Sequence, residues 1–114
     1  GLKGPVPDEL RLLTTLQELD MSDNALTGEI PASLRLFTNL TMLSAYNNQL
    51  SGHIPSWISA WTKMEYLRLD GNDLSGTIPG AVGTLSSLIH LDLSDQTNYG
   101  GGGLSGPLPD FAST

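Results

Sequence analysis

The chain of 114 residues repeats one pattern with a period of 24. Each copy begins with an apolar residue, at Leu16, Leu40, Met64 and Leu88. We therefore divide this single segment, 1–114, into a partial repeat 1–15, repeats 16–39, 40–63 and 64–87, and a last repeat 88–114. The last repeat rejoins the pattern six residues late, which places a six-residue insertion within 97–103. A short period of this kind predicts stacked coils rather than a folded globule.

Each copy has three parts with different patterns. The first part alternates apolar and polar residues, as in Leu19, Asp20 and Met21, which is typical of a half-buried strand. The second part carries Gly28 and Pro31, so we expect it to turn the chain rather than to continue a sheet. Apolar positions three residues apart follow, which suits a 3₁₀ turn or short α-helix. These positions are Leu34, Ile58, Val82 and Phe37, Trp61, Leu85.

An amide side chain follows the predicted strand in every full copy, at Asn24, Asn48 and Asn72. An inward-pointing amide can donate to and accept from the backbone groups of a turning chain, so the repeated position predicts a ladder of hydrogen bonds. The fourth copy has Gln96 instead, and its longer side chain leads us to expect a distorted ladder there.

The pattern Leu-x-x-Leu-x-Leu-x-x-Asn-x-Leu resembles the leucine-rich repeat. The segments 26–31, 50–55 and 74–79 read Leu-x-Gly-x-Ile-Pro, which resembles the plant-type subclass in particular. The resemblance implies an α/β solenoid, a right-handed superhelix with a parallel sheet on the concave side and 3₁₀ or short helical turns on the convex side. It also implies a non-enzymatic module that binds proteins, peptides or glycans, as in receptor-like ectodomains and polygalacturonase inhibitors.

Composition excludes several other classes of protein. The chain has no cysteine, which excludes disulfides, a thiolate nucleophile and cysteine-containing zinc sites, and which departs from the cysteine-bearing caps of plant ectodomains. A net charge of −7 disfavours nucleic acid and anionic membranes as partners. No apolar run is long enough to cross a bilayer, and residues 1–10 lack the features of a signal peptide.

Outward-facing side chains of the predicted sheet form columns on the concave face. The candidate ligand-binding residues in these columns are Glu18, Asp20, Met42, Ser44, Tyr46, Tyr66, Arg68, Asp70, His90 and Asp92. With Asp23 and Asp95 just past the strands, this face holds most of the acidic charge, which would attract a basic peptide or protein, while Arg68 would anchor an anion. Alternatively, the columns are polar only because they are exposed, and Arg68 merely pairs with Asp92 one coil away.

Two further features carry competing interpretations. Asn39-Leu40-Thr41 is a sequon for N-linked glycosylation, a short motif that also arises by chance. The insertion would either present Tyr99 to a partner or, with its four consecutive glycines, be a tolerated loop.

No motif supports catalysis, a metal or a cofactor. A glycine fingerprint at residues 101–106 is followed by Pro107 and Pro109 where a nucleotide-binding helix would begin. His90, although near acids, shares a strand with Asp92 and does not converge with it on a substrate.

The sequence thus favours an extracellular or cell-surface recognition module for a protein or peptide ligand, with a secreted enzyme as one such ligand. The alternative is a structural or adhesive protein whose coils stack or pack into an assembly. The missing caps favour that alternative and predict self-association through open solenoid ends.

Overall fold

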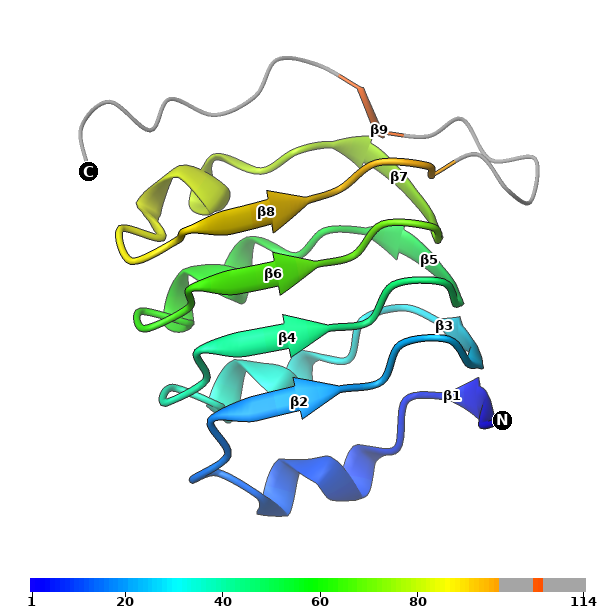
Figure 1. Cartoon of the computed structure of the whole chain (residues 1–114), viewed down its shortest axis with the longest axis horizontal. Helices are drawn as coiled ribbons and strands as arrows, with labels where there is room; N and C mark the ends of the chain where they lie inside the picture. Colours follow the sequence, from blue (N-terminus) through cyan, green and yellow to red (C-terminus); the bar gives the residue numbers. More distant parts are fainter. Residues whose placement is uncertain (97–103, 106–114) are drawn as a thin grey trace.

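The computed structural model describes residues 1–96 and 104–105, and in this part of the chain the coils stack in sequence order (Figure 1). The described strands are β1 (Lys3–Pro5), β2 (Glu18–Asp20), β3 (Ala25–Gly28), β4 (Met42–Ser44), β5 (Gln49–His53), β6 (Tyr66–Arg68), β7 (Asp73–Thr77), β8 (His90–Asp92) and β9 (Leu104–Ser105). The described 3₁₀ helices are η1 (Asp8–Leu12), η2 (Ala32–Leu36), η3 (Ser56–Ala60) and η4 (Gly80–Thr84).

The strands form two parallel sheets, and one of them was not predicted. The expected sheet has the order β2-β4-β6-β8, and a second sheet has the order β1-β3-β5-β7-β9. The prediction that the glycine-containing half only turns the chain is therefore wrong. Gly28, Gly52 and Gly76 have φ angles of 79°, 80° and 81° and lie at or next to the ends of β3, β5 and β7, so the residues before them remain free to pair.

The two sheets differ in register, which sets their relative tilt. In the first sheet Glu18 faces Met42, its equivalent one full repeat later. In the second sheet Ser51 faces Asp73 and not its equivalent Ser75, so each strand is staggered by two residues against the next. The strands of the second sheet consequently run obliquely to those of the first (Figure 1).

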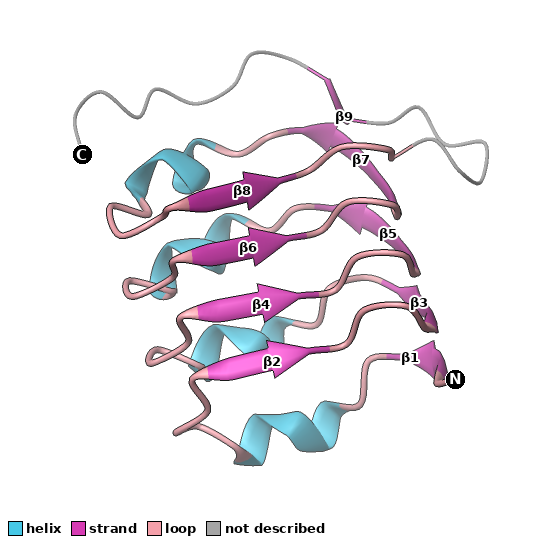
Figure 2. Cartoon of the chain, viewed as in Figure 1, coloured by secondary structure: helices cyan, strands magenta, loops and turns pink. Residues whose placement is uncertain are grey.

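A 3₁₀ helix follows each strand of the second sheet from β1 to β7, as expected from the spacing of the apolar positions (Figure 2). A proline stands directly before each of these helices, with φ between −64° and −72°. Because proline fixes φ and donates no hydrogen bond, it suits the first position of a helical turn. These prolines are Pro7, Pro31, Pro55 and Pro79.

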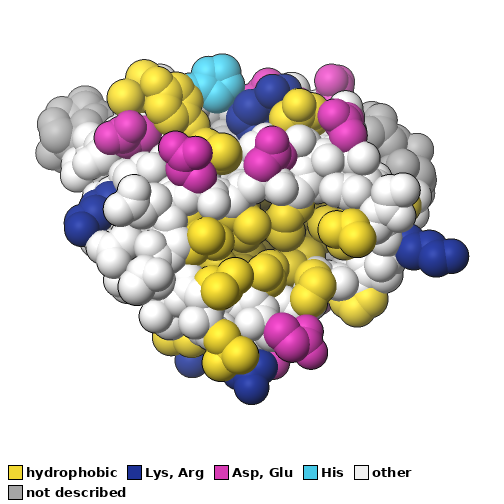
Figure 3. All heavy atoms as spheres, turned by 60° about the horizontal axis from the view of Figure 1, so that its bottom comes forward, with side chains coloured by type: hydrophobic (Ala, Val, Ile, Leu, Met, Phe, Trp, Pro, Cys, Tyr) yellow, Lys and Arg dark blue, Asp and Glu magenta, His cyan; other side chains and the backbone are white. Residues whose placement is uncertain are grey.

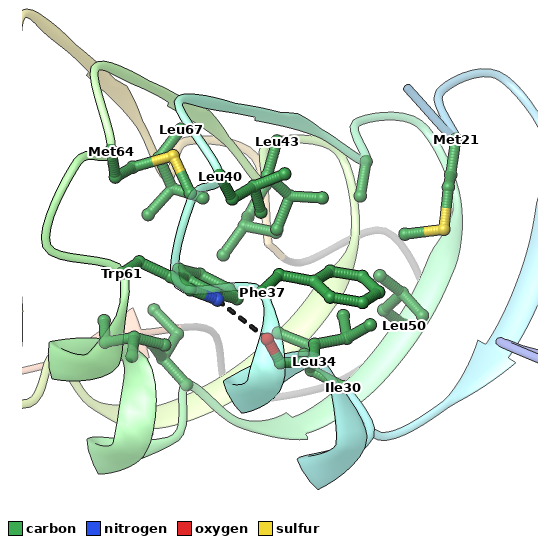
Figure 4. Close-up of a cluster of buried hydrophobic side chains, with 14 of the residues drawn as sticks. Met21, Ile30, Leu34, Phe37, Leu40, Leu43, Leu50, Trp61, Met64 and Leu67 are labelled. Carbon is green, nitrogen blue, oxygen red and sulfur yellow. Dashed lines mark hydrogen bonds between the residues drawn. The ribbon is translucent and has the colours of Figure 1, made fainter. Parts of the chain in front are cut away.

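The apolar residues of successive coils share one core between the sheets and the helices (Figure 4). Phe37, Trp61 and Leu85 are buried, as their shared position predicted. The indole nitrogen of Trp61 donates a hydrogen bond to the carbonyl of Leu34 over 2.9 Å, so its polar atom is also satisfied (Figure 4). Trp57 packs edge-on against Trp61 and is only partly buried.

The amide column lies inside the coils and bonds to backbone. Asn48 accepts the N–H of Leu26 at 3.0 Å and donates to the carbonyls of Met21 and Ala45 at 2.9 and 3.1 Å. Asn72 repeats this set one coil later, and Asn24 accepts the N–H of Leu2.

The distortion expected at Gln96 does not occur. Gln96 accepts the N–H of Leu74 at 3.0 Å and donates to the carbonyls of Leu69 and Leu93. Its longer side chain therefore bonds to the equivalent backbone groups of the preceding coil and of its own coil.

Candidate ligand-binding face

The concave face, defined as the outward side chains of the first sheet and of the residues just after it, is ordered by the sheet register. One column contains Glu18, Met42, Tyr66 and His90, and the next contains Asp20, Ser44, Arg68 and Asp92. Ser22, Tyr46, Asp70 and Ser94 follow in the corresponding places after the strands. The structure therefore brings the candidate residues together on one surface.

Arg68 is the centre of this face and is already paired. Its Nε and one terminal nitrogen donate to the two carboxylate oxygens of Asp70 at 3.2 and 2.9 Å. The guanidinium carbon also lies 3.9 Å from the centroid of the Tyr46 ring, within the range of a cation–π contact. These contacts hold the side chain in one position.

The predicted alternative, in which Arg68 pairs with Asp92, is therefore wrong in its partner. A two-pronged hydrogen bond to Asp70 combines charge with matching geometry, whereas Asp92 contributes only through longer-range attraction. The hydrogen bond with Asp70 also raises the pKa of Arg68. Because Asp70 neutralises it, Arg68 is a poor anchor for an anion.

Aromatic side chains lie beside this centre. The rings of Tyr66 and His90 are 6.5 Å apart between centroids, and Tyr66 is 45% exposed. Met42 on β4 is half-buried. Together with Tyr66 on β6 and His90 on β8, it offers a ligand apolar contact area. Ser44, by contrast, is 8% exposed, so this candidate residue offers a ligand little surface.

The two ends of the polar column carry aspartates with the same local geometry. Asp20 accepts hydrogen bonds from the backbone N–H and the hydroxyl of Ser22 at 3.0 and 2.5 Å. The Ser22 hydroxyl, and then its N–H, lower the pKa of Asp20 because they stabilise the charged form.

Asp92 makes the corresponding bonds with Ser94 at 3.0 and 2.6 Å, which lower the pKa of Asp92 in the same way. Arg68 and His90 lower it further by attraction. Asp20 and Asp92 therefore stay ionised in mildly acidic solution, and neither forms an ion pair within the described residues.

A ridge of residues with left-handed backbone, a conformation not predicted from the sequence, borders the concave face. Asp23, Asn47, Gly71 and Asp95 have φ angles of 57°, 55°, 69° and 57°. Asn47 donates to the carboxylate of Asp23 at 2.9 Å, which links neighbouring coils along the ridge. The signal was present in the sequence, because Asp, Asn and Gly are the residues that adopt this conformation most readily.

The sequon asparagine lies away from this face. Asn39 is in the turn between η2 and β4, and its side-chain oxygen accepts a hydrogen bond from the ammonium group of Lys63 at 2.8 Å. His53 is on β5, in the second sheet, where its Nδ1 lies 3.2 Å from the carbonyl oxygen of Ser75. Tyr99 and the glycine fingerprint fall outside the described residues.

Two other kinds of feature are absent from residues 1–96 and 104–105. In this part of the chain no three His, Asp or Glu side chains are grouped so as to hold a metal ion. Nor does it contain a helix with the length and apolar character needed to cross a membrane.

Comparison with known proteins places this geometry in a family. The model of the Leucine Rich Repeat family matches residues 15–37, 39–61 and 63–85. No curated protein sequence matches the chain significantly.

Three solved plant structures illustrate the similarity. The HAESA receptor kinase ectodomain of Arabidopsis, in complex with a peptide hormone ligand, is 39% identical over 80% of this chain and 16% of its own, with a TM-score of 0.76. The BIR2 ectodomain of Arabidopsis is 35% identical over 100% of this chain and 57% of its own, with a TM-score of 0.85. A plant ice-binding protein is 34% identical over 82% of this chain and 30% of its own, with a TM-score of 0.76.

The chain thus spans less than two thirds of each of these proteins. Repeat matches over more than half of its length agree with the paired parallel sheets, the 3₁₀ turns and the ectodomain neighbours. The chain therefore belongs to the leucine-rich-repeat family, and its coils are similar to those of plant receptor ectodomains.

Proposed function

We propose that this segment is a non-enzymatic recognition module of an extracellular or cell-surface protein, and that its concave face binds a basic, extended peptide or protein segment. The similarity to plant receptor ectodomains, one of them solved with a peptide hormone ligand, supports the general role. The similarity to an ice-binding protein means that the fold alone does not decide the ligand. The charges on the concave face favour a basic ligand.

The observation that carries the proposal is the distribution of charge along the polar column. The Arg68–Asp70 pair makes the centre neutral, whereas Asp20 and Asp92 at the two ends keep carboxylates with lowered pKa values. Glu18 lies exposed beside Asp20. A ligand that crosses the coils therefore meets negative charge, then a neutral aromatic centre, then negative charge again.

The spacing of these charges predicts the spacing of basic residues in the ligand. Asp20 and Asp92 lie on β2 and β8, three strand intervals apart. With neighbouring strands about 4.8 Å apart, the separation is about 14 Å, which an extended chain spans in roughly four residues. We therefore expect two Lys or Arg side chains four positions apart, with apolar residues between them above Tyr46 and Tyr66.

Synthetic peptides test this proposal directly. Titration of labelled peptides with two lysines at positions i and i+4 should give saturable binding that weakens with salt, and adjacent lysines should bind more weakly. Asp20→Asn with Asp92→Asn should weaken binding at least about tenfold, equivalent to about 1.4 kcal/mol. Both changes keep the side-chain shape and the acceptor for the neighbouring serine.

The matched control removes two charges from another part of the surface. Asp8→Asn with Glu9→Gln changes exposed acids at the start of η1, away from the concave face, and should leave binding unchanged. Equal weakening in both double variants would show attraction to net charge only. Unchanged binding in the Asp20 and Asp92 variant would contradict the proposed site.

A second candidate function, contact between copies of the chain, is favoured by one observation. The first described coil, which contains β1 and η1, carries an apolar patch in which Leu2, Leu12 and Leu13 are exposed by 61%, 72% and 49% (Figure 3). Burying such a patch is favourable in water, so we propose that it supports contact between copies in a structural or adhesive assembly. Sedimentation at rising concentration should then show dimers that Leu12→Glu removes, and a monomer throughout would contradict this function.

A further inference from the structure

Asn39 is the acceptor position of the one Asn-x-Ser/Thr sequon in the printed sequence. It stands in the turn between η2 and β4, and the residue after it, Leu40, is completely buried in the core. Thr41, the third residue of the motif, donates its hydroxyl to the carbonyl of Gln17 at 3.1 Å. The buried Leu40 and the hydrogen bond of Thr41 thus fix the turn, and Asn39 remains partly exposed.

The amide of Asn39 differs from the other structurally placed asparagines in one respect. Asn24, Asn48 and Asn72 each donate Nδ2 to backbone carbonyls inside the coil. Asn39 uses only its Oδ1, which accepts from Lys63, and its Nδ2 has no hydrogen-bond partner among the described residues. Its nitrogen is therefore available without breaking any described contact.

The surroundings of Asn39 leave room for a large attached group. Thr15 and Lys63 occupy the same turn position in the coils before and after, and both are exposed. Ser87, one coil further on, is exposed as well. An attached group at Asn39 would therefore extend from the flank of the solenoid into solvent.

We propose that Asn39 carries an N-linked glycan when the chain passes through a eukaryotic secretory pathway. The donor is a lipid-pyrophosphate-linked oligosaccharide. The bond from its first sugar C1 to the pyrophosphate oxygen breaks, a bond from C1 to Nδ2 forms, and Nδ2 gives up one proton while the lipid pyrophosphate leaves. The amide keeps its carbonyl oxygen, so the hydrogen bond from Lys63 remains compatible with the modified side chain.

The inference relies on the extracellular location in the proposed function and not on the ligand of the concave face. The two proposals can therefore fail separately. Peptide binding is measured on unmodified protein from bacteria, whereas glycosylation is measured on the same chain from a secretory host.

The experiment expresses residues 1–114 behind a cleavable secretion signal in insect cells and measures the intact mass of both secreted and cell-retained protein. We expect a mass increase that peptide N-glycosidase removes, leaving aspartate in place of the asparagine. Asn39→Gln and Thr41→Ala should each abolish the increase, and Thr41→Ser should retain it because serine also provides the hydroxyl. An unmodified mass for the unaltered chain in both fractions would overturn the proposal, as would an increase that persists in Asn39→Gln.

Discussion

The backbone N–H of Leu74 donates a hydrogen bond to the side-chain oxygen of Gln96 over 3.0 Å. This contact between neighbouring coils protects a buried amide. Gln96→Ala should therefore speed hydrogen exchange at Leu74 by at least about tenfold, because a lost hydrogen bond of about 1.4 kcal/mol changes a local opening equilibrium by that factor. The backbone N–H of Leu50, which donates to the side-chain oxygen of Asn72, is the internal control, and its exchange rate should not change. Equal acceleration at both amides would mean global destabilisation instead.

Asn48→Ala should destabilise the fold by about 2 to 3 kcal/mol. Asn48 is 1% exposed, and its removal leaves the Leu26 N–H without its acceptor in a buried site, while the Met21 carbonyl keeps only the hydrogen bond from Asn24. Urea denaturation followed by circular dichroism measures the change.

Asn24→Ala is the matched control for this prediction. The same type of side chain there is only half-buried and accepts the Leu2 N–H at the exposed end of the stack, where water can replace it. We expect a loss of under about 1 kcal/mol. Similar losses of stability in the two variants would contradict the view that burial is what makes the hydrogen bonds of the amide column costly to lose.

The coil architecture could be predicted from the sequence because one period fixes every coil. Alternation identified β2, β4, β6 and β8, and their equal spacing gave the columns of the concave face. The second sheet was missed because glycine was read as a turn signal. A strand that continues through Gly52 and a turn that begins at Gly52 have the same residue pattern, and only the backbone pairing to the next coil distinguishes them.

The partner of Arg68 could not be predicted for a different reason. Asp70 and Asp92 both lie within reach of a long side chain, one two residues along the chain and one on the next strand. The choice depends on whether both carboxylate oxygens can face the guanidinium, and on support from the Tyr46 ring. Both depend on side-chain geometry, which a residue pattern does not contain.

Gly71→Ala should destabilise the chain by about 1 to 2 kcal/mol, because its φ of 69° is strained for a residue with a Cβ. The new methyl group would also meet the side-chain oxygen of Asn47, which is held by its hydrogen bond to Asp23. Asn47→Ala in the same chain removes that obstacle, so the double variant should lose less than the sum of the two single losses. Chemical denaturation of all four proteins measures the coupling, and additive losses would show that backbone strain alone opposes the alanine.

Ser22→Ala should raise the pKa of Asp20 toward its ordinary value of about 3.9, because the Ser22 hydroxyl is the main cause of its lowered pKa. The sign of the stability effect follows from linkage. A carboxyl whose pKa is lower in the folded protein adds stability above its unfolded pKa, and this contribution disappears as pH falls through the folded value. The variant should therefore be less stable than the parent at pH about 7, by under about 1 kcal/mol because Asp20 is exposed, and this difference should shrink as pH falls below the unfolded pKa of Asp20. Carbon-detected NMR titration of the Asp20 carboxyl measures the shift, with Ser22→Thr as the control that keeps the hydroxyl. An unchanged pKa in Ser22→Ala would show that the Ser22 backbone N–H suffices to hold the carboxylate.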